Sequence, residues 1–199
     1  MRLRPLVLGA VVLGLTVATS GVATAAAKLK PACNLVTDPE GDGTHHASGL
    51  SSPVLDIKSL DVATNGKKVA AILRLKSLTM STSDPITLGQ VDWSVFFQIS
   101  GTNYEFAYRK GTGSTPTYSG SFTAGTTSAE PKVTFDVPNA TITWSIDRSV
   151  LANLKRPKQN LVQIGGTTSW MGGNADGAGP SPKNVKYPDL YPSCLKIPA

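Results

Sequence analysis

The chain has 199 residues, with 19 Lys and Arg against 13 Asp and Glu, and only two cysteines. The basic excess is mild, and Lys and Arg are not clustered among aromatic residues, so a nucleic acid is not an expected partner. After the first 25 residues no apolar run approaches the roughly 18 residues of a membrane-spanning helix, and we expect no membrane span.

The N-terminus has the pattern of an export signal. Arg2 and Arg4 precede an apolar run, and small residues then lead to Ala23-Thr24-Ala25, which fits a signal-peptidase site. We therefore predict that residues 1–25 are a signal peptide and that the protein is secreted. Residues 26–199 are long enough for one core and short for two, so we predict a single domain over that range.

The two cysteines lie close to the two ends of this predicted domain. Outside the cell Cys33 and Cys194 can pair, and closing so long a loop stabilises a fold by roughly 3–5 kcal/mol in the chain-entropy model. We predict a disulfide between them. A reactive free pair or a metal site is the alternative, although neither a further Cys nor a nearby His is present to complete a zinc set.

Alternation of apolar and polar residues dominates the rest of the chain and predicts β-strands. The expected strands cover residues 54–63, 67–76, 91–99, 104–108, 133–137, 142–146 and 161–168. Asn65-Gly66 suits a type I′ hairpin turn, and Gly- and Pro-rich composition predicts loops over 111–116, 124–131 and 171–192. Asp147 is a good cap for one short helix over 148–155, which Pro157 would stop. These elements predict an all-β, antiparallel β-sandwich, jelly-roll or immunoglobulin-like, with one short helix.

Acidic residues in Gly-rich loops are the main candidates for chemistry. The segment from Asp38 to Gly43 holds three carboxylates in a tight bend, and Asp38 and Asp42 are best suited to a hard cation such as calcium. Asp56 lies in an apolar strand start, where a buried carboxylate must find a partner or a metal. Asp176 is a further acid in a Gly-rich loop. The alternatives are a solvated acidic turn and an Asp56 that faces water at a sheet edge.

Three of these segments, in this order, resemble a known group of secreted bacterial domains. Asp38-Pro-Glu-Gly-Asp42, then Leu55-Asp56-Ile57, and a late Asn174-Ala175-Asp176 are similar to the family 9 carbohydrate-binding modules and the related DOMON domains. The stretch 141–151, a late strand and a helical turn, resembles the same group, so the likeness spans about residues 34–180. It implies a β-sandwich with calcium near the first loop, held by Asp38, Asp42, Asp56 and Asp176.

The aromatic residues bear on the choice of ligand. Trp93 and Trp144 fall on the apolar faces of their strands and are predicted to be core. Trp170 precedes a glycine-rich stretch and is the candidate platform for stacking a sugar ring. Relatives among the DOMON domains hold haem through Met and His, for which Met80, Met171, His45 and His46 are the residues available, but loop positions account for all four without haem.

Signals for an enzyme are few. The motifs of serine hydrolases, zinc proteases and P-loop proteins are missing, and Glu105, on a strand among polar residues, has no second acid at a defined place with which to build a glycosidase. We therefore expect an extracellular, non-catalytic module, stabilised by calcium, that binds extracellular or cell-wall polysaccharide. The alternatives are a structural or protein-interaction module at the cell surface without a sugar site and, as a third reading, a hydrolase.

Overall fold

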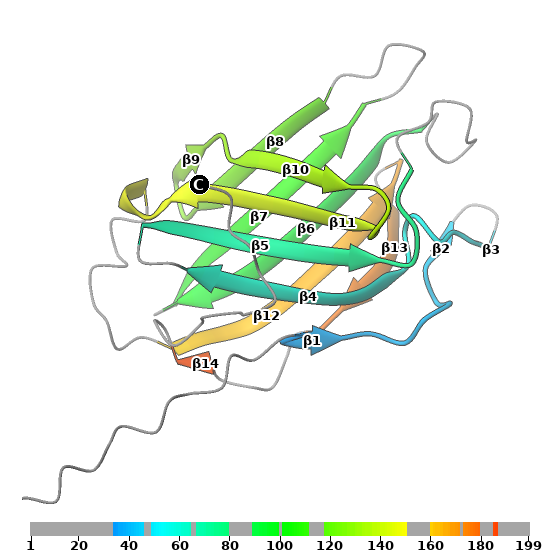
Figure 1. Ribbon diagram of the computed structural model, residues 1–199, viewed down its shortest axis with the longest axis horizontal. Coiled ribbons are helices and arrows are strands. Elements are labelled where there is room, and N and C mark those ends of the chain that lie inside the picture. Colours follow the sequence, from blue (N-terminus) through cyan, green and yellow to red (C-terminus); the bar gives the residue numbers. More distant parts are fainter. Residues whose placement is uncertain are drawn as a thin grey trace, which may run out of the picture.

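The computed structural model describes residues 34–45, 49–64, 67–79, 89–99, 101–111, 118–150, 160–171, 173–179 and 185–186. Within these ranges the chain is almost wholly β and forms two large antiparallel sheets and one small one. Figure 1 shows the large sheets stacked face to face, with the strands of one crossing those of the other. The predicted fold class, an all-β antiparallel sandwich, is confirmed.

The first large sheet has five strands in the order β1-β4-β5-β11-β10. The second has the order β13-β12-β6-β7-β8-β9, with β14 also paired to β12, and the small sheet pairs β2 with β3. The bounds are β1 Val36–Thr37, β2 Thr44–His45, β3 Leu50–Ser51, β4 Ile57–Thr64, β5 Lys68–Leu75, β6 Val91–Ile99, β7 Thr102–Lys110, β8 Tyr118–Ala124, β9 Thr127–Ala129, β10 Lys132–Asp136, β11 Thr141–Asp147, β12 Asn160–Trp170, β13 Gly173–Ala178 and β14 Val185–Lys186.

The core lies between the two large sheets and follows the alternation of their strands. On β6 every second side chain from Val91 to Ile99 is buried, and on β11 the same holds for Ile142, Trp144 and Ile146. Trp93 and Trp144 are both fully buried, as predicted. Their indole N–H groups donate to the carbonyls of Val54 and Ala107, so neither ring leaves a buried donor unsatisfied.

The prediction of a loop over 171–192 was wrong for two segments. β13 pairs with β12 from Gly173 to Ala178, and β14 pairs with β12 at Val185 and Lys186. Backbone hydrogen bonds form β13 although its sequence is poor in strand-forming residues, and Ala175 and Ala178 are buried where it meets the core. An edge strand of small residues gives too weak an alternation to be seen in sequence.

The two-residue strands β1, β2 and β3 were not predicted. Nor were β8 and β9, of which β9 lies inside the segment 124–131 that had been assigned to a loop. Both belong to the edge of the larger sheet, where Phe122 of β8 is fully buried. The predicted helix begins as a 3₁₀ turn at Arg148–Val150, and the rest of it lies outside the described residues. Asn65-Gly66, the predicted hairpin turn, also lies outside them, although β4 and β5 pair antiparallel on either side of it.

Candidate metal centre

The loop that joins β1 to β2 lies directly against Asp56. Gly41 has a φ of 102°, a conformation that side chains disfavour, and its N–H donates to Asp56 Oδ2 at 2.7 Å. Gly43 is buried so closely on Asp56 that a Cβ atom there would lie 2.4 Å from the Asp56 Cα. The two glycines therefore let the acidic loop close onto the start of β4.

A second segment brings in Asp176, which is 119 residues beyond Ile57 in the chain. Asp176 lies on β13, opposite Thr168 of β12 and beside an irregularity in that pairing. Its Oδ2 accepts a hydrogen bond from the backbone N–H of Ile57, and its Oδ1 accepts one from Gly177, both at 2.7 Å. Asp176 thus joins β13 to the residue that follows Asp56.

Three carboxylates converge where these segments meet. Asp38, Asp42 and Asp176 each place a carboxylate oxygen so that the three atoms lie within 4.8 Å of one another. Asp42 is exposed, whereas Asp38 and Asp176 are half-buried. Glu40, the third acid of the loop, is instead paired with Lys58 at 3.0 Å in a largely exposed ion pair. The loop therefore contributes two of its three acids to the cluster, and these are the two that the sequence favoured.

Asp56 adds a buried negative charge beside this cluster. Its side chain is fully buried, and its Oδ2 accepts from Gly41 and lies 3.5 Å from the Nζ of Lys76. Among the residues that the structure describes, Asp56 Oδ1, Asp38 Oδ2 and the Ser52 hydroxyl oxygen are buried without a hydrogen-bond partner. Leaving a buried acceptor unsatisfied costs about 1–3 kcal/mol, and more when the group is charged. A positive ion at the cluster would remove that cost for the two carboxylates.

The electrostatic environment agrees with this geometry. Burial, followed by the negative charge of Asp176, raises the pKa of Asp38 from 3.8 to about 6, with smaller contributions from Asp42 and Asp56. Burial also raises the pKa of Asp176, although hydrogen bonds from Ile57 and Gly177 act in the opposite direction. Both shifts show that the folded chain holds these negative charges at a cost.

The ligand set matches the chemistry of a hard cation. The converging atoms are all carboxylate oxygens from three segments, which suits calcium or magnesium and lacks the nitrogen and sulfur donors that zinc and copper prefer. Among the described residues, these three acids and Asp56 have one recorded ion-pair partner, Lys76, so a local excess of negative charge remains. The residues present therefore fit the calcium that the sequence led us to expect.

The other predicted site residues lie elsewhere. Trp170, at the end of β12, is half-buried and packs against the core, and a Cβ at Gly89 would fall 2.5 Å from its Nε1. Met171 is exposed next to it. Cys33, Cys194, Met80 and His46 lie outside the described residues, as does the predicted signal peptide. Their predicted roles stay predictions.

Sequence inspection missed Lys76 and Gly43. Lys76 follows β5, and nothing in its local pattern marks it as a partner of Asp56. Gly43 is visible only as one glycine of an acidic turn, whereas its contact with Asp56 depends on how the loop folds back. Neither residue gave a sequence signal for its role.

Comparison with known proteins adds no assignment. No protein-family model matches the chain, and neither a curated protein nor a solved structure matches it. The described part of the chain contains no helix long and apolar enough to cross a membrane. The functional interpretation therefore depends on the geometry of the site.

Proposed function

We propose that this protein is a secreted, non-catalytic β-sandwich module in which a calcium ion fixes the loop at one end of the sandwich. Asp38, Asp42 and Asp176 would hold the ion, and Asp56 would supply the buried charge beside it. The observation that carries the proposal is the pair of buried, unpartnered oxygens, Asp56 Oδ1 and Asp38 Oδ2, next to three converging carboxylates. A bound cation accounts for all of them at once.

Such an ion would act on stability. The four acids come from the β1–β2 loop, the start of β4 and β13, which are segments far apart in the sequence. A cation replaces repulsion between their carboxylates with attraction and so ties the three segments together. The segment before β4 is already joined to β12, because Thr168 Oγ1 donates to the Leu55 carbonyl at 2.6 Å. Calcium would therefore stabilise the edge of the larger sheet as well as the loop.

Calcium is a better match than magnesium for this set of ligands. Calcium accepts six to eight oxygens in irregular arrangements, whereas magnesium demands a regular octahedron and keeps several waters. A loop held by glycines, a strand start and an edge strand form an irregular ligand set. Extracellular calcium modules have dissociation constants of about 0.1–1 mM, and secretion would place this chain where calcium reaches that range.

The proposal is tested by thermal unfolding and calorimetric titration. Calcium at about 100 times its dissociation constant should stabilise the folded chain by about 2.7 kcal/mol, and a chelator should reverse the shift in melting temperature. Asp42→Asn removes an exposed member of the cluster and should abolish most of the shift without unfolding the protein. Asp147→Asn, which removes an exposed acid at the end of β11, is the matched control and should keep the full shift. An unfolding transition that is the same in calcium and in chelator would refute the proposal.

A further inference from the structure

A row of small side chains crosses the outer face of the seven-stranded sheet. The register places Thr167 of β12 beside Ser94 of β6, Ser94 beside Ala107 of β7, and Ala107 beside Ser121 of β8. Each alternates with a core residue on its strand and so points away from the interior. Because adjacent strands lie about 4.8 Å apart, the row extends about 14 Å across the sheet.

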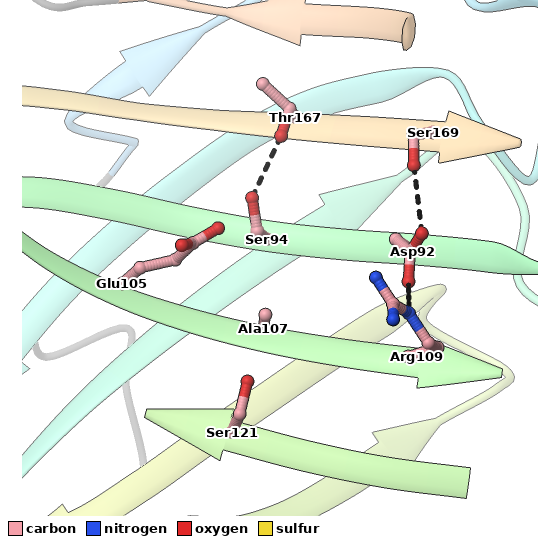
Figure 2. A pocket seen from close by; sticks show the side chains of 8 residues that line it. All are labelled: Asp92, Ser94, Glu105, Ala107, Arg109, Ser121, Thr167 and Ser169. Carbon is pink, nitrogen blue, oxygen red and sulfur yellow. Dashed lines mark hydrogen bonds and ion pairs between the residues drawn. The ribbon is translucent and has the colours of Figure 1, made fainter. Parts of the chain in front are cut away.

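Longer side chains flank this row on both sides. Two residues from Ser94 and Ala107 in one direction along β6 and β7, Asp92 lies opposite Arg109. Two residues from them in the other direction, Phe96 lies opposite Glu105. The two flanking pairs are four residues apart along each strand, which corresponds to about 13 Å. The small residues, together with Asp92 and Arg109 on one side and Glu105 on the other, line an open groove of about 340 Å³, shown in Figure 2.

The polar side chains of the groove differ in how many hydrogen bonds they already make within the protein. Asp92 accepts hydrogen bonds from Arg109 at 2.6 Å, from Gln90 at 2.9 Å and from Ser169 at 3.1 Å, so its charge is neutralised within the wall. The hydroxyls of Ser94 and Thr167 bond each other at 2.9 Å.

Glu105 is different. It is exposed, and its carboxylate makes no hydrogen bond or ion pair to any other residue in the part of the chain that the structure describes. Figure 2 shows its side chain extending toward the row of small residues. Glu105 also lines an adjoining hollow on the same face, together with Phe96 and Gln163.

We propose that this groove binds a neutral oligosaccharide that lies across the strands, along the row from Thr167 to Ser121. Glu105 accepts hydrogen bonds from sugar hydroxyls, and the serine and threonine hydroxyls of the floor both donate and accept. Arg109 offers the guanidinium donors that Asp92 does not use. This inference goes beyond the calcium site and needs only a folded sheet.

Several features favour a neutral, hydroxyl-rich ligand. The charges of Asp92 and Arg109 cancel, and the remaining carboxylate of Glu105 repels uronic acids and phosphates. A single exposed carboxylate gives little affinity for a cation, because solvent screens an exposed pair. Phe96 lies outside the lining of the groove but lines the adjoining hollow that also contains Glu105, with its ring over Gly165, where a Cβ would come within 2.5 Å of the ring. Hydroxyl groups on the floor and an aromatic ring at the side suit a sugar chain.

Binding is tested on the full chain in saturating calcium, first on immobilised oligosaccharides and then by calorimetry. The probes are neutral gluco- and manno-oligosaccharides, with oligomers of uronic acids and of glucosamine as charged comparisons. Glu105→Gln removes the unpartnered carboxylate, and Ala107→Leu fills the floor. Each should weaken binding of the neutral probes about tenfold or more, the first because a charge-assisted hydrogen bond is lost and the second because the leucine occupies the space of the ligand. Glu130→Gln, an exposed acid outside the groove, is the matched control and should bind as the unaltered chain does.

Three results would overturn the groove as a glycan site. These are no binding of any neutral oligosaccharide, unchanged binding in both groove variants, and binding of charged oligomers alone. The calcium-dependent melting shift is measured in the same variants and should be unchanged in both. If no sugar binds while calcium still raises the melting temperature, the glycan site is wrong and the calcium site stands. If sugar binds while calcium leaves the melting temperature unchanged, the calcium site is wrong and the glycan site stands.

Discussion

Two buried aspartates, five residues apart, have opposite surroundings. Asp61, on β4, is almost fully buried, and both its oxygens are satisfied: Oδ2 accepts from Arg74 at 2.7 Å and Oδ1 from the backbone N–H of Leu35 at 2.9 Å. Asp56, just before β4, is equally buried, but its Oδ1 has no partner within the described residues. Arg74 neutralises Asp61 at 2.7 Å, whereas Asp56 lies among other acids and its recorded counter-charge within the described residues is Lys76, at 3.5 Å.

The contrast separates a carboxylate whose burial is explained by its partners from one whose burial is not. Asp61 joins β1 to the first sheet, because it accepts a hydrogen bond from the backbone N–H of Leu35, the residue just before β1. A buried charge with a complete partner set is explained by folding alone. Asp56 is not explained in that way, and its missing partner is what points to a cation. The predictions below test this difference.

The largest effect is expected when the two residues are compared without calcium. Asp61→Asn should lower the free energy of unfolding by about 2–3 kcal/mol, because it leaves the partly buried Arg74 without its counter-charge. Asp56→Asn should change the free energy of unfolding by less than about 1 kcal/mol in chelator. The amide oxygen can still accept the hydrogen bond from Gly41, and repulsion between the acids of the cluster falls. The lost ion pair with Lys76 contributes little, because that lysine is half-exposed. Denaturant unfolding in chelator measures both.

Calcium should then reverse the contrast. The Asp61→Asn variant should keep the whole calcium-dependent gain in stability, whereas the Asp56→Asn variant should lose most of it. The distinction between the two aspartates would be wrong if both variants responded to calcium equally.

A smaller effect is expected from the loop glycine that contacts Asp56. Gly43→Ala places a methyl group against the Asp56 backbone, which cannot move aside as a side chain can, so stability should fall by about 1–3 kcal/mol and calcium should bind more weakly. Gly177→Ala, beside Asp176, has open space around the new methyl and should change stability by less than about 0.5 kcal/mol. Equal losses in the two variants would show that the close approach of the loop is unimportant.

The smallest effect is expected from pH. The pKa of Asp38 is about 6 in the folded chain against an ordinary 3.8, so between about pH 4 and 6 the folded state binds more protons than the unfolded state. Without calcium, the contribution of Asp38 to stability is therefore complete below pH 4 and is lost as the pH rises toward 6. Because protons and calcium compete for the same carboxylates, the gain from calcium should grow over that range.

The Asp38→Asn variant isolates this contribution from the other titrating groups. In chelator, the unaltered chain should lose stability relative to the variant as the pH rises from 4 to 6. A difference that stays constant across that range would contradict the raised pKa.

The regular interior of the fold could be predicted from the sequence because alternation reports directly on burial. Strands β5, β6, β7 and β11 each place apolar residues at every second position, and both predicted core tryptophans are buried. β13 could not be predicted, since its small residues form a strand only through backbone pairing with β12. The same reason hides the groove: Ser94, Ala107 and Ser121 are unremarkable on their own strands and form a row only through register.

The sequence by itself determined which carboxylates are available and which strand faces are apolar, because both depend on residue type and local spacing. It also marked Asp38, Asp42, Asp56 and Asp176 as a possible set. Only the tertiary structure decided that Asp38, Asp42 and Asp176 meet, that Asp56 lies buried beside them, and that Glu40 turns away to Lys58. Contacts across 119 residues depend on sheet order and strand register, which arise from packing of the whole chain.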